Sequence, residues 1–338
     1  MVGEEKANKV LADSLFPEPG PKLVGIARLA ASGESIRQGH EVEYFTLPVR
    51  SVLSRCNSKR VSFEWTINPY RGCEFACKYC YARYTHEFME MRNAADFEQK
   101  IFVKQHAADL LRQELRHVKP GEHIAIGAAT DPYQPAERRY EVTRAILEEL
   151  SRHKGLHLGI ITKSNLVLRD IELLRELSKH NRLGVTLTIT TLDADLARLL
   201  EPRAPRPDLR LEAVRQLSGA GVHTGVSCCP VIPEITDSAK NLGAVVEATV
   251  KAGGHYIFAN PLFLKPCSAA VFMPFLEQEF PHLARAYRER YKDRAFLPKS
   301  YSQRIAQLIA RLRQKHGLIK KERWEPPATR PETQMHLF

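Results

Sequence analysis

The spacing of apolar segments constrains the fold of this 338-residue chain more than any other feature. Short runs with the pattern of strands are centred near residues 125, 160, 187, 226 and 257. Segments with the helical repeat lie between them, at 142–150, 170–177, 208–220 and 238–251. Strands that alternate with helices indicate a parallel sheet with crossover helices. An alternating strand at 63–68 brings the number to six, which is short of the eight in a closed barrel. The pattern therefore predicts an α/β fold with six parallel strands.

The two ends of the chain have a different character. Residues 1 to about 50 contain several Pro and Gly residues without a sustained period, so we expect them to be loosely structured. Residues 301–315 show an amphipathic helical pattern, and a Pro-rich tether follows Trp324. The expected organisation is an N-terminal extension, the main α/β domain, a basic helical segment and a flexible tail, at 1–55, 56–283, 284–324 and 325–338.

Positive charge is concentrated near the C-terminus. The formal net charge of the chain is +11, and between Arg285 and Arg323 there are 13 Lys and Arg residues against 3 Asp and Glu, which leaves +10. A basic surface attracts polyanions, because contacts with phosphates release counterions. A solvated helix face is the alternative, but the sequence favours a nucleic-acid partner.

The cellular setting can be inferred from composition. No apolar run of about 18 residues exists, and the first residues lack the pattern of a secretory signal. The chain has seven cysteines, an odd number, and three of them are clustered. This usage argues against a disulfide framework, so we expect a protein of the reducing cytoplasm without a membrane span.

Those three cysteines form the pattern C-x3-C-x2-C at Cys73, Cys77 and Cys80. Three thiolates are one too few for a closed zinc site or for a [4Fe–4S] cluster with Cys on every iron. A cluster bound here would keep one open iron position. The alternative is a structural zinc ion with a fourth ligand such as His86, but this spacing is not among the common zinc patterns.

The cysteine spacing, with the aromatic Tyr79 before Cys80, resembles the signature of the radical S-adenosylmethionine (SAM) enzymes. Further segments are similar to the radical SAM group related to spore photoproduct lyase, between about residues 40 and 290: 68–73, 130–135, 162–164, 200–205 and 230–237. The resemblance implies a partial (β/α)6 barrel, and a [4Fe–4S] cluster on Cys73, Cys77 and Cys80 whose open iron binds SAM. It also implies reductive cleavage of SAM to a 5′-deoxyadenosyl radical, with an electron donor such as flavodoxin or ferredoxin.

Polar residues at the ends of the predicted strands are candidates for SAM contacts, because ligands of parallel barrels sit at these ends. Asp131 suits the ammonium group of SAM, Lys163 and Arg203 suit its carboxylate, and Thr190 suits its ribose. Further candidates are Tyr79, Thr130 and Ser164. Each residue alone is equally consistent with a turn or a helix cap, and Asp193 in particular suits a cap.

A hydrogen donor is the second catalytic element that the resemblance implies. In spore photoproduct lyase the radical abstracts hydrogen from a thymine dimer in DNA, and a cysteine a few dozen residues beyond the cluster motif returns one. Here no cysteine lies between Cys80 and Cys228, so that residue does not carry over. Cys228 and Cys229 end a strand and are our candidates, with Cys267 and Cys56 as alternatives. Buried, inert cysteines or a second cluster without a known spacing are the other interpretations.

The last residues suggest a protein partner. Gln334, Met335, Leu337 and Phe338 resemble the short peptide with which bacterial DNA polymerases and repair proteins dock on the sliding clamp. The apolar pair would fill a pocket and the Pro-rich tether would give reach. An apolar end that folds back onto the core is the alternative.

The leading hypothesis is therefore a cytoplasmic radical SAM enzyme that acts on DNA, as a repair lyase does. A second hypothesis keeps the radical chemistry but directs it at RNA or at a protein side chain. A third, from another class, is a metal-stapled module that binds nucleic acid without catalysis.

Overall fold

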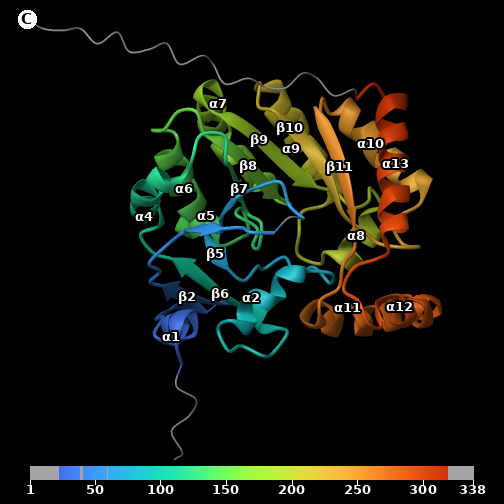
Figure 1. Ribbon diagram of the computed structural model, residues 1–338, viewed down its shortest axis with the longest axis horizontal. Helices are drawn as coiled ribbons and strands as arrows, with labels where there is room; N and C mark the ends of the chain where they lie inside the picture. The colour runs from blue at the N-terminus through green and yellow to red at the C-terminus, as the bar shows by residue number, and fades with distance from the viewer. Residues whose placement is uncertain (1–22, 39–40, 59, 319–338) are drawn as a thin grey trace, which may run out of the picture.

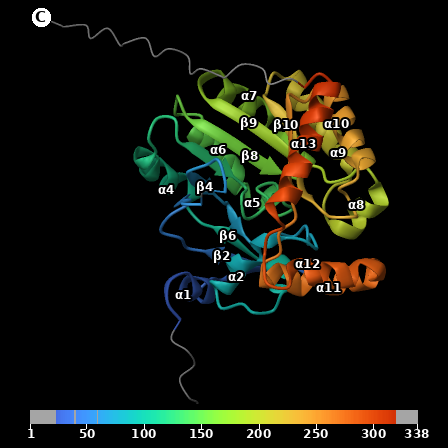
Figure 2. The same cartoon turned by 45° about the vertical axis from the view of Figure 1, so that its right-hand side comes forward.

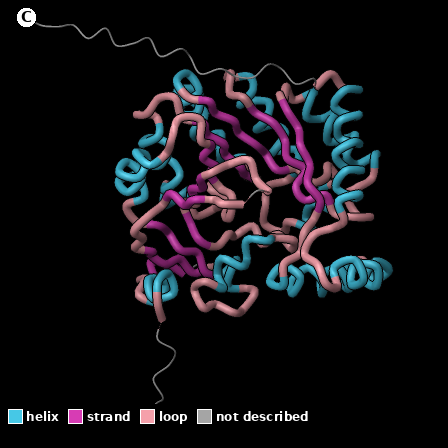
Figure 3. Tube along the Cα trace, viewed as in Figure 1, coloured by secondary structure: helices cyan, strands magenta, loops and turns pink. Residues whose placement is uncertain are grey.

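The computed structural model describes residues 23–38, 41–58 and 60–318. Strands in these ranges form two sheets (Figure 1). The larger sheet has the order β11-β10-β9-β8-β7-β4-β3, and the smaller sheet has the order β1-β2-β6-β5. Figure 3 shows the strands in magenta and the helices, in cyan, that surround the larger sheet.

The larger sheet confirms the predicted architecture. Its parallel strands are β4 (Trp65–Ile67), β7 (His123–Ile126), β8 (His157–Thr162), β9 (Arg182–Thr188), β10 (Thr224–Val231) and β11 (Tyr256–Pro261). An additional edge strand, β3 (Leu53–Arg55), runs antiparallel to β4. Because β3 and β11 are the two ends of the strand order and do not pair in the described chain, the barrel of six parallel strands is open.

Helices cover the outer side of this sheet. The four predicted crossover helices are α6 (Val142–Leu150), α7 (Ile171–His180), α9 (Pro207–Gly219) and α10 (Ala239–Lys251). Two more helices lie beside them: α4 (Ala107–Glu114), which the sequence did not predict, and α13 (Lys299–Lys315), which follows the last strand. The predicted amphipathic helix near the C-terminus is α13, which stands beside α10 and packs on β11 (Figure 2).

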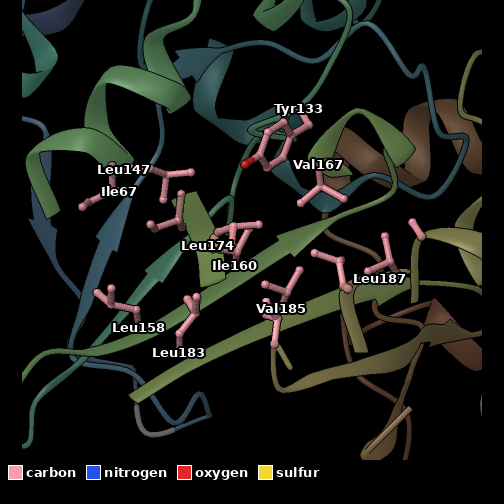
Figure 4. Close-up of a cluster of buried hydrophobic side chains, with 14 of the residues drawn as sticks. Ile67, Tyr133, Leu147, Leu158, Ile160, Val167, Leu174, Leu183, Val185 and Leu187 are labelled. Carbon is pink, nitrogen blue, oxygen red and sulfur yellow. The ribbon is translucent and has the colours of Figure 1, made fainter. Parts of the chain in front are cut away.

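The main core lies between these helices and the sheet, and Figure 4 shows part of it. Alternate residues of β8 contribute to it: Leu158 and Ile160 are buried, whereas Gly159 and Ile161 line a cavity on the inner face. This alternation follows from the two-residue repeat of a strand. Each fully buried Leu or Ile contributes about 1.5–3 kcal/mol, so the helix-facing side chains anchor the sheet while their neighbours are left for function.

The N-terminal region corrects one prediction. Residues 23–50 are not loosely structured but contain α1 (Gly25–Ala31), β1 (Ser35–Gln38) and β2 (Glu43–Leu47). The sequence pattern missed β2 because its main partner, the parallel strand β6 (Lys100–Lys104), is remote in the chain. A short strand, β5 (Tyr70–Arg71), pairs antiparallel with β6 and leads into the cysteine segment.

The remaining elements are short or lie near the C-terminal end. They are α2 (Tyr84–Glu87), α3 (Asp96–Gln99), α5 (Glu137–Tyr140), α8 (Ala194–Leu200), α11 (Pro266–Glu279) and α12 (Ala284–Tyr291), with 3₁₀ turns at Tyr81–Arg83, Leu115–His117, Asn165–Asp170 and Pro281–Leu283. Asp193 caps α8 by accepting hydrogen bonds from two backbone amides, which confirms the cap interpretation. Asp170 precedes α7, but its carboxylate binds Arg144 and Arg169 and does not cap the helix.

Two predictions about the chain ends stay predictions. The division at 55, 283 and 324 is one of them, although β3 places residues 53–55 in the larger sheet. The tail 325–338 and its clamp-docking peptide lie outside the described residues. Within the described ranges, no helix combines the length and the apolar character needed to cross a membrane.

Candidate active site

The cysteine segment forms a tight loop between β5 and the 3₁₀ turn at Tyr81–Arg83. Gly72 opens it with a φ of +82°, and a Cβ there would lie 2.7 Å from the carbonyl oxygen of Lys100. Backbone amides anchor the loop at both ends: Cys73 donates to Phe97 (2.9 Å), and Lys78 donates to Leu200 (2.9 Å). The loop therefore requires glycine at its entrance, because a side chain would collide with backbone.

The segment that follows β7 supports the loop from the other side. Gln134 donates from Nε2 to the carbonyl oxygen of Gly72 (3.1 Å) and accepts from the amide of Glu74 (3.0 Å). The Thr130 hydroxyl also donates to Gly72 (2.6 Å), and the Glu74 carboxylate accepts from the amide of Ala136 (2.8 Å). Thr130, which was predicted to contact SAM, thus binds the backbone of the cysteine loop at Gly72.

The three thiols are close enough to influence one another electrostatically. Burial raises the pKa of Cys73, Cys77 and Cys80, that of Cys77 to about 12, and the neighbouring thiols raise the pKa of Cys73 and Cys77 further. Without a metal the thiols are therefore protonated at neutral pH. Metal binding would deprotonate them, as it does at thiolate sites generally.

All three cysteines line one large cavity, which has a volume of about 3430 Å³ and extends along the inner face of the larger sheet. Thr130, Asp131, Lys163, Tyr79 and Cys229 line the same cavity, so the structure brings these predicted site residues together. Ligand pockets usually measure about 300–1,000 Å³, so this cavity has room for SAM and for part of a large substrate.

The donor set fits an iron–sulfur cluster better than a single metal ion. Among the described residues, no three or more His, Cys, Asp or Glu side chains are arranged to hold one ion. His86 does not provide the fourth ligand of the zinc alternative: its Nε2 pairs with the carbonyl oxygen of Lys100 (3.1 Å), and its ring packs on Phe97 and Phe102. Three thiols that line one cavity, of which that of Cys77 is buried and those of Cys73 and Cys80 are half-buried, match a cluster with one iron left for a ligand.

A buried network of charges lies behind the cysteine loop. The Tyr79 hydroxyl donates to Glu201, and the Glu201 carboxylate pairs with Arg210 at 2.5 Å. Burial opposes the charge of Glu201, but Arg210 and Lys163 outweigh it and hold the pKa of this carboxyl below its usual value. The Lys163 ammonium lies 5.7 Å from the centre of the Tyr79 ring. Burial alone would lower the pKa of Lys163, yet Cys77, Glu201 and Asp131 raise it above its usual value.

Asp131 joins the ends of two neighbouring strands. Its carboxylate accepts from the Thr162 hydroxyl (2.6 Å) and from the backbone amides of Lys163 (2.7 Å) and Tyr133 (3.0 Å). A carboxylate offers about four lone-pair sites, so one acceptor position is left after these three bonds. Burial raises the pKa of Asp131. The residue is thus positioned at the cavity wall with capacity for one further donor.

Three predicted SAM contacts lie apart from the described cavity lining. Ser164 caps the turn at Asn165–Asp170 by accepting from the amide of Leu166 (3.2 Å). The Arg203 guanidinium pairs with Glu41. Thr190 is buried, and its hydroxyl has no hydrogen-bond partner among the described residues. The assignment of these three residues to SAM stays a prediction.

The adjacent cysteines of β10 point to opposite sides of the sheet. Cys228 is fully buried in the main core, whereas Cys229 lines the cavity. Burial raises the pKa of the Cys229 thiol, against the effect of hydrogen bonds with Ser227 and Asn260. Of the two predicted donors, only Cys229 therefore shares the cavity with the cluster cysteines. Cys56 also lines the cavity.

Sequence reasoning missed Arg210, which is fully buried although it is charged. Its guanidinium also donates to the carbonyl oxygens of Thr188 (2.8 Å) and Pro205 (2.7 Å). The signal was present: Arg210 occupies the same helical stripe as the buried Ala213, Val214 and Leu217 of α9. A charge on the apolar face of a helix indicates a buried partner.

The cavity lining is strongly cationic. Asp131 is the acidic residue of the described lining, against nine basic ones: Arg55, Arg60, Arg71, Lys104, Lys163, Arg182, Lys265, Lys299 and Arg313. Aromatic residues are interleaved with them, and the rings of Tyr81, Phe263 and Phe296 form a continuous series of contacts with centroids 5.1 Å apart at each step. The Arg60 guanidinium covers Phe296 at 4.0 Å.

Comparison with known proteins identifies the family. Residues 67–242, more than half of the chain, match the family model described as the radical SAM superfamily. The chain belongs to this superfamily and is an enzyme. Membership implies a [4Fe–4S] cluster and SAM as cofactors.

Individual relatives extend this assignment over most of the chain. An uncharacterized protein of Mycobacterium tuberculosis is 33% identical over 317 residues, which span 92% of this chain and 91% of the relative. An uncharacterized protein of Methanocaldococcus jannaschii is 32% identical over 218 residues, or 64% of this chain and 77% of the relative. A mutant of spore photoproduct lyase with bound AdoMet and dinucleoside spore photoproduct has a TM-score of 0.62 at 15% identity, and covers 89% of this chain and 85% of that one. The last likeness shows a shared fold.

Proposed function

We propose that this radical SAM enzyme acts on a nucleic-acid strand, as a DNA repair lyase does. The observation that carries the proposal is the composition of the described cavity lining. It contains nine Lys and Arg residues and a series of aromatic rings, but a single Asp as its acidic residue. Proteins that bind single-stranded nucleic acid combine a cationic groove for the backbone with aromatic side chains for the bases. The solved spore photoproduct lyase complex, which contains a dinucleoside photoproduct, shares this fold and supports DNA as the substrate class.

In this proposal Cys73, Cys77 and Cys80 hold the cluster. When bound, the cluster supplies the electron that breaks a sulfur–carbon bond of SAM. Lys163 offers a fixed positive charge for the carboxylate of SAM, and Asp131 offers its remaining acceptor site for the ammonium group. Glu201 and Arg210 hold the Tyr79 hydroxyl and so fix the aromatic residue next to Cys80.

Cys229 is the hydrogen donor in this proposal. It lines the cavity together with the cluster cysteines, while its neighbour Cys228 faces the core. A protonated thiol can give up a hydrogen atom, and the raised pKa keeps Cys229 protonated at neutral pH.

The basic C-terminal segment contributes two of its cations to the described cavity lining. Lys299 and Arg313 belong to it and line the cavity. Other members are neutralised by acidic partners: Arg288 pairs with Glu277, Arg290 with Glu234 and Arg304 with Asp237. The cavity therefore provides a more specific argument for a nucleic-acid partner than the charge of the whole segment does.

The test has two stages. The full chain is reconstituted anaerobically with iron and sulfide and then reduced with SAM, and 5′-deoxyadenosine is measured. We expect the wild type to form it, Cys77→Ala to form none, and Cys267→Ser, a control outside the described lining, to match the wild type. Deuterated single-stranded DNA, damaged DNA, RNA and peptide are then compared as sources of deuterium in 5′-deoxyadenosine. Deuterium transfer from peptide but from no nucleic acid would contradict the proposed substrate.

A further inference from the structure

Two cations of the cavity wall, Arg71 and Lys104, lie side by side on the smaller sheet. Arg71 of β5 pairs in register with Phe102 of β6, and Lys104 follows Phe102 by two residues. Because side chains two residues apart on a strand share a face, Arg71 and Lys104 are diagonal neighbours on one face. Both line the cavity.

Lys104 is buried and Arg71 is half-buried, and they differ from the buried Arg83 and Arg210 in having no acidic partner within ion-pair distance in the described chain. Arg83 is paired with Glu98, and Arg210 is paired with Glu201. By contrast, no described carboxylate lies within ion-pair distance of Arg71 or Lys104. Burying a charge without a partner is costly, so such a pair is unusual unless a ligand completes it.

The hydrogen-bonding capacity of the pair is largely unused. Lys104 is 8% exposed, and its ammonium makes no hydrogen bond with a described residue. Arg71 donates one bond from Nη1 to the carbonyl oxygen of Thr85 (3.3 Å), and its buried Nε has no described partner. Glu114 is the acid that acts on Lys104 electrostatically, but its carboxylate accepts from the amides of Val52 (3.1 Å) and Leu53 (2.9 Å).

We propose that Arg71 and Lys104 form an anion subsite that binds a phosphodiester group of the nucleic-acid strand, an inference that rests on the proposed function. A guanidinium with free N–H groups and an adjacent ammonium suit a phosphate, the first through directed hydrogen bonds and the second as a point charge. Lys265 also lines the cavity, and its ammonium lies 4.0 Å from the centre of the Tyr84 ring. Tyr84 immediately precedes Thr85, whose carbonyl oxygen accepts the hydrogen bond from Arg71. This row of cations would hold the strand backbone while its bases face the aromatic rings of the cavity.

The experiment measures the binding of a labelled single-stranded oligodeoxynucleotide to the full-length, cluster-loaded chain at several salt concentrations. Lys104→Met should weaken binding about tenfold or more, because a charge-assisted hydrogen bond is lost. It should also reduce the slope of log K against log salt by about 1, since one phosphate contact disappears. Arg71→Gln should behave similarly. Lys251→Met is the matched control, because Lys251 is exposed, pairs with Glu247 and lies outside the described lining.

Equal affinity and equal salt slope for wild type and Lys104→Met would overturn the subsite. If the wild type binds no oligonucleotide, the proposed nucleic-acid function is contradicted. A second measurement then tests the anion subsite separately. Inorganic phosphate should then raise the thermal midpoint of the wild type more than that of Lys104→Met. An equal shift in both proteins would reject the anion site as well.

Discussion

The hydroxyl of Tyr79 donates a hydrogen bond to the carboxylate of Glu201, although 122 residues separate them in the chain. Tyr79 lies between two of the candidate cluster cysteines, and Glu201 is the residue that follows α8. Arg210 neutralises Glu201 from behind. The conformation of the cysteine loop therefore depends on a buried ion pair whose residues lie in a remote part of the chain.

Glu201→Gln should destabilise the fold by roughly 3–5 kcal/mol, because it leaves the Arg210 guanidinium buried without a counter-charge. Chemical denaturation of the wild type and the variant measures the difference. Glu212→Gln is the matched control, since it breaks a solvent-exposed pair with Arg215 and should leave stability close to that of the wild type. If both variants lose the same stability, the buried network does not have the role assigned to it.

Gly72→Ala should disturb the cysteine loop and lower the iron content after reconstitution. The residue has a φ of +82°, and its Cβ would lie 2.7 Å and 2.9 Å from the carbonyl oxygens of Lys100 and Phe97. Gly121 has a similar φ of +85°, but a Cβ there would have no neighbouring atom within 4 Å. Gly121→Ala is therefore the control, because it introduces backbone strain of about 1–3 kcal/mol without a collision. Iron bound per chain should fall for Gly72→Ala and stay at the wild-type level for Gly121→Ala. Full iron content in Gly72→Ala would show that the loop tolerates the collision.

Cys229 should react with a small alkylating reagent before Cys228 does. Cys229 lines the cavity, whereas Cys228 is fully buried in the core. Mass spectrometry of the native chain after brief exposure gives the extent of labelling at each position, and denatured protein, in which both react, is the control. Faster labelling of Cys228 would contradict the assignment of Cys229 as the cysteine of β10 that lines the cavity.

Lys104→Met should stabilise the fold, and the gain should depend on pH. Burial and the charge of Arg71 lower the pKa of Lys104 from 10.5 to about 7. Between these pH values the unfolded chain binds a proton that the folded chain has released, so the lysine destabilises the fold increasingly as pH falls from 10.5 to 7. The gain is bounded by roughly 1.4 kcal/mol per pKa unit.

Denaturant titrations of Lys104→Met and wild type at pH 7 and pH 10 test this pH dependence. The gain in the free energy of unfolding of Lys104→Met over the wild type should be larger at pH 7. A variant that is more stable but binds nucleic acid less well is the signature of a residue kept for function. A variant that is less stable than the wild type at pH 7 would indicate a structural role for Lys104.

The sequence was sufficient for the parts of this fold that are encoded locally. Short apolar or alternating runs predicted all six parallel strands, and the three clustered cysteines lie in a loop that faces the cavity. Polar residues at strand ends were predicted to converge, and Asp131 and Lys163 do so because carboxyl ends of parallel strands share one edge.

Contacts between remote segments were not accessible in the same way. Arg203 suited a carboxylate ligand in the sequence, but Glu41 from the unpredicted N-terminal structure neutralises it. Arg71 and Lys104 meet only because β5 pairs with β6, and no local period reveals that pairing. Arg210 is the exception, since its position on the apolar stripe of α9 was readable.

In the described chain β3 and β11 do not pair with each other, so the barrel is open. This opening affects how a long polymer would enter the cavity. A closed ring of strands would admit a chain only by threading it from one terminus. An open barrel imposes no such topological demand, so the nucleic-acid strand of the proposed function could be bound at an internal site as readily as at an end.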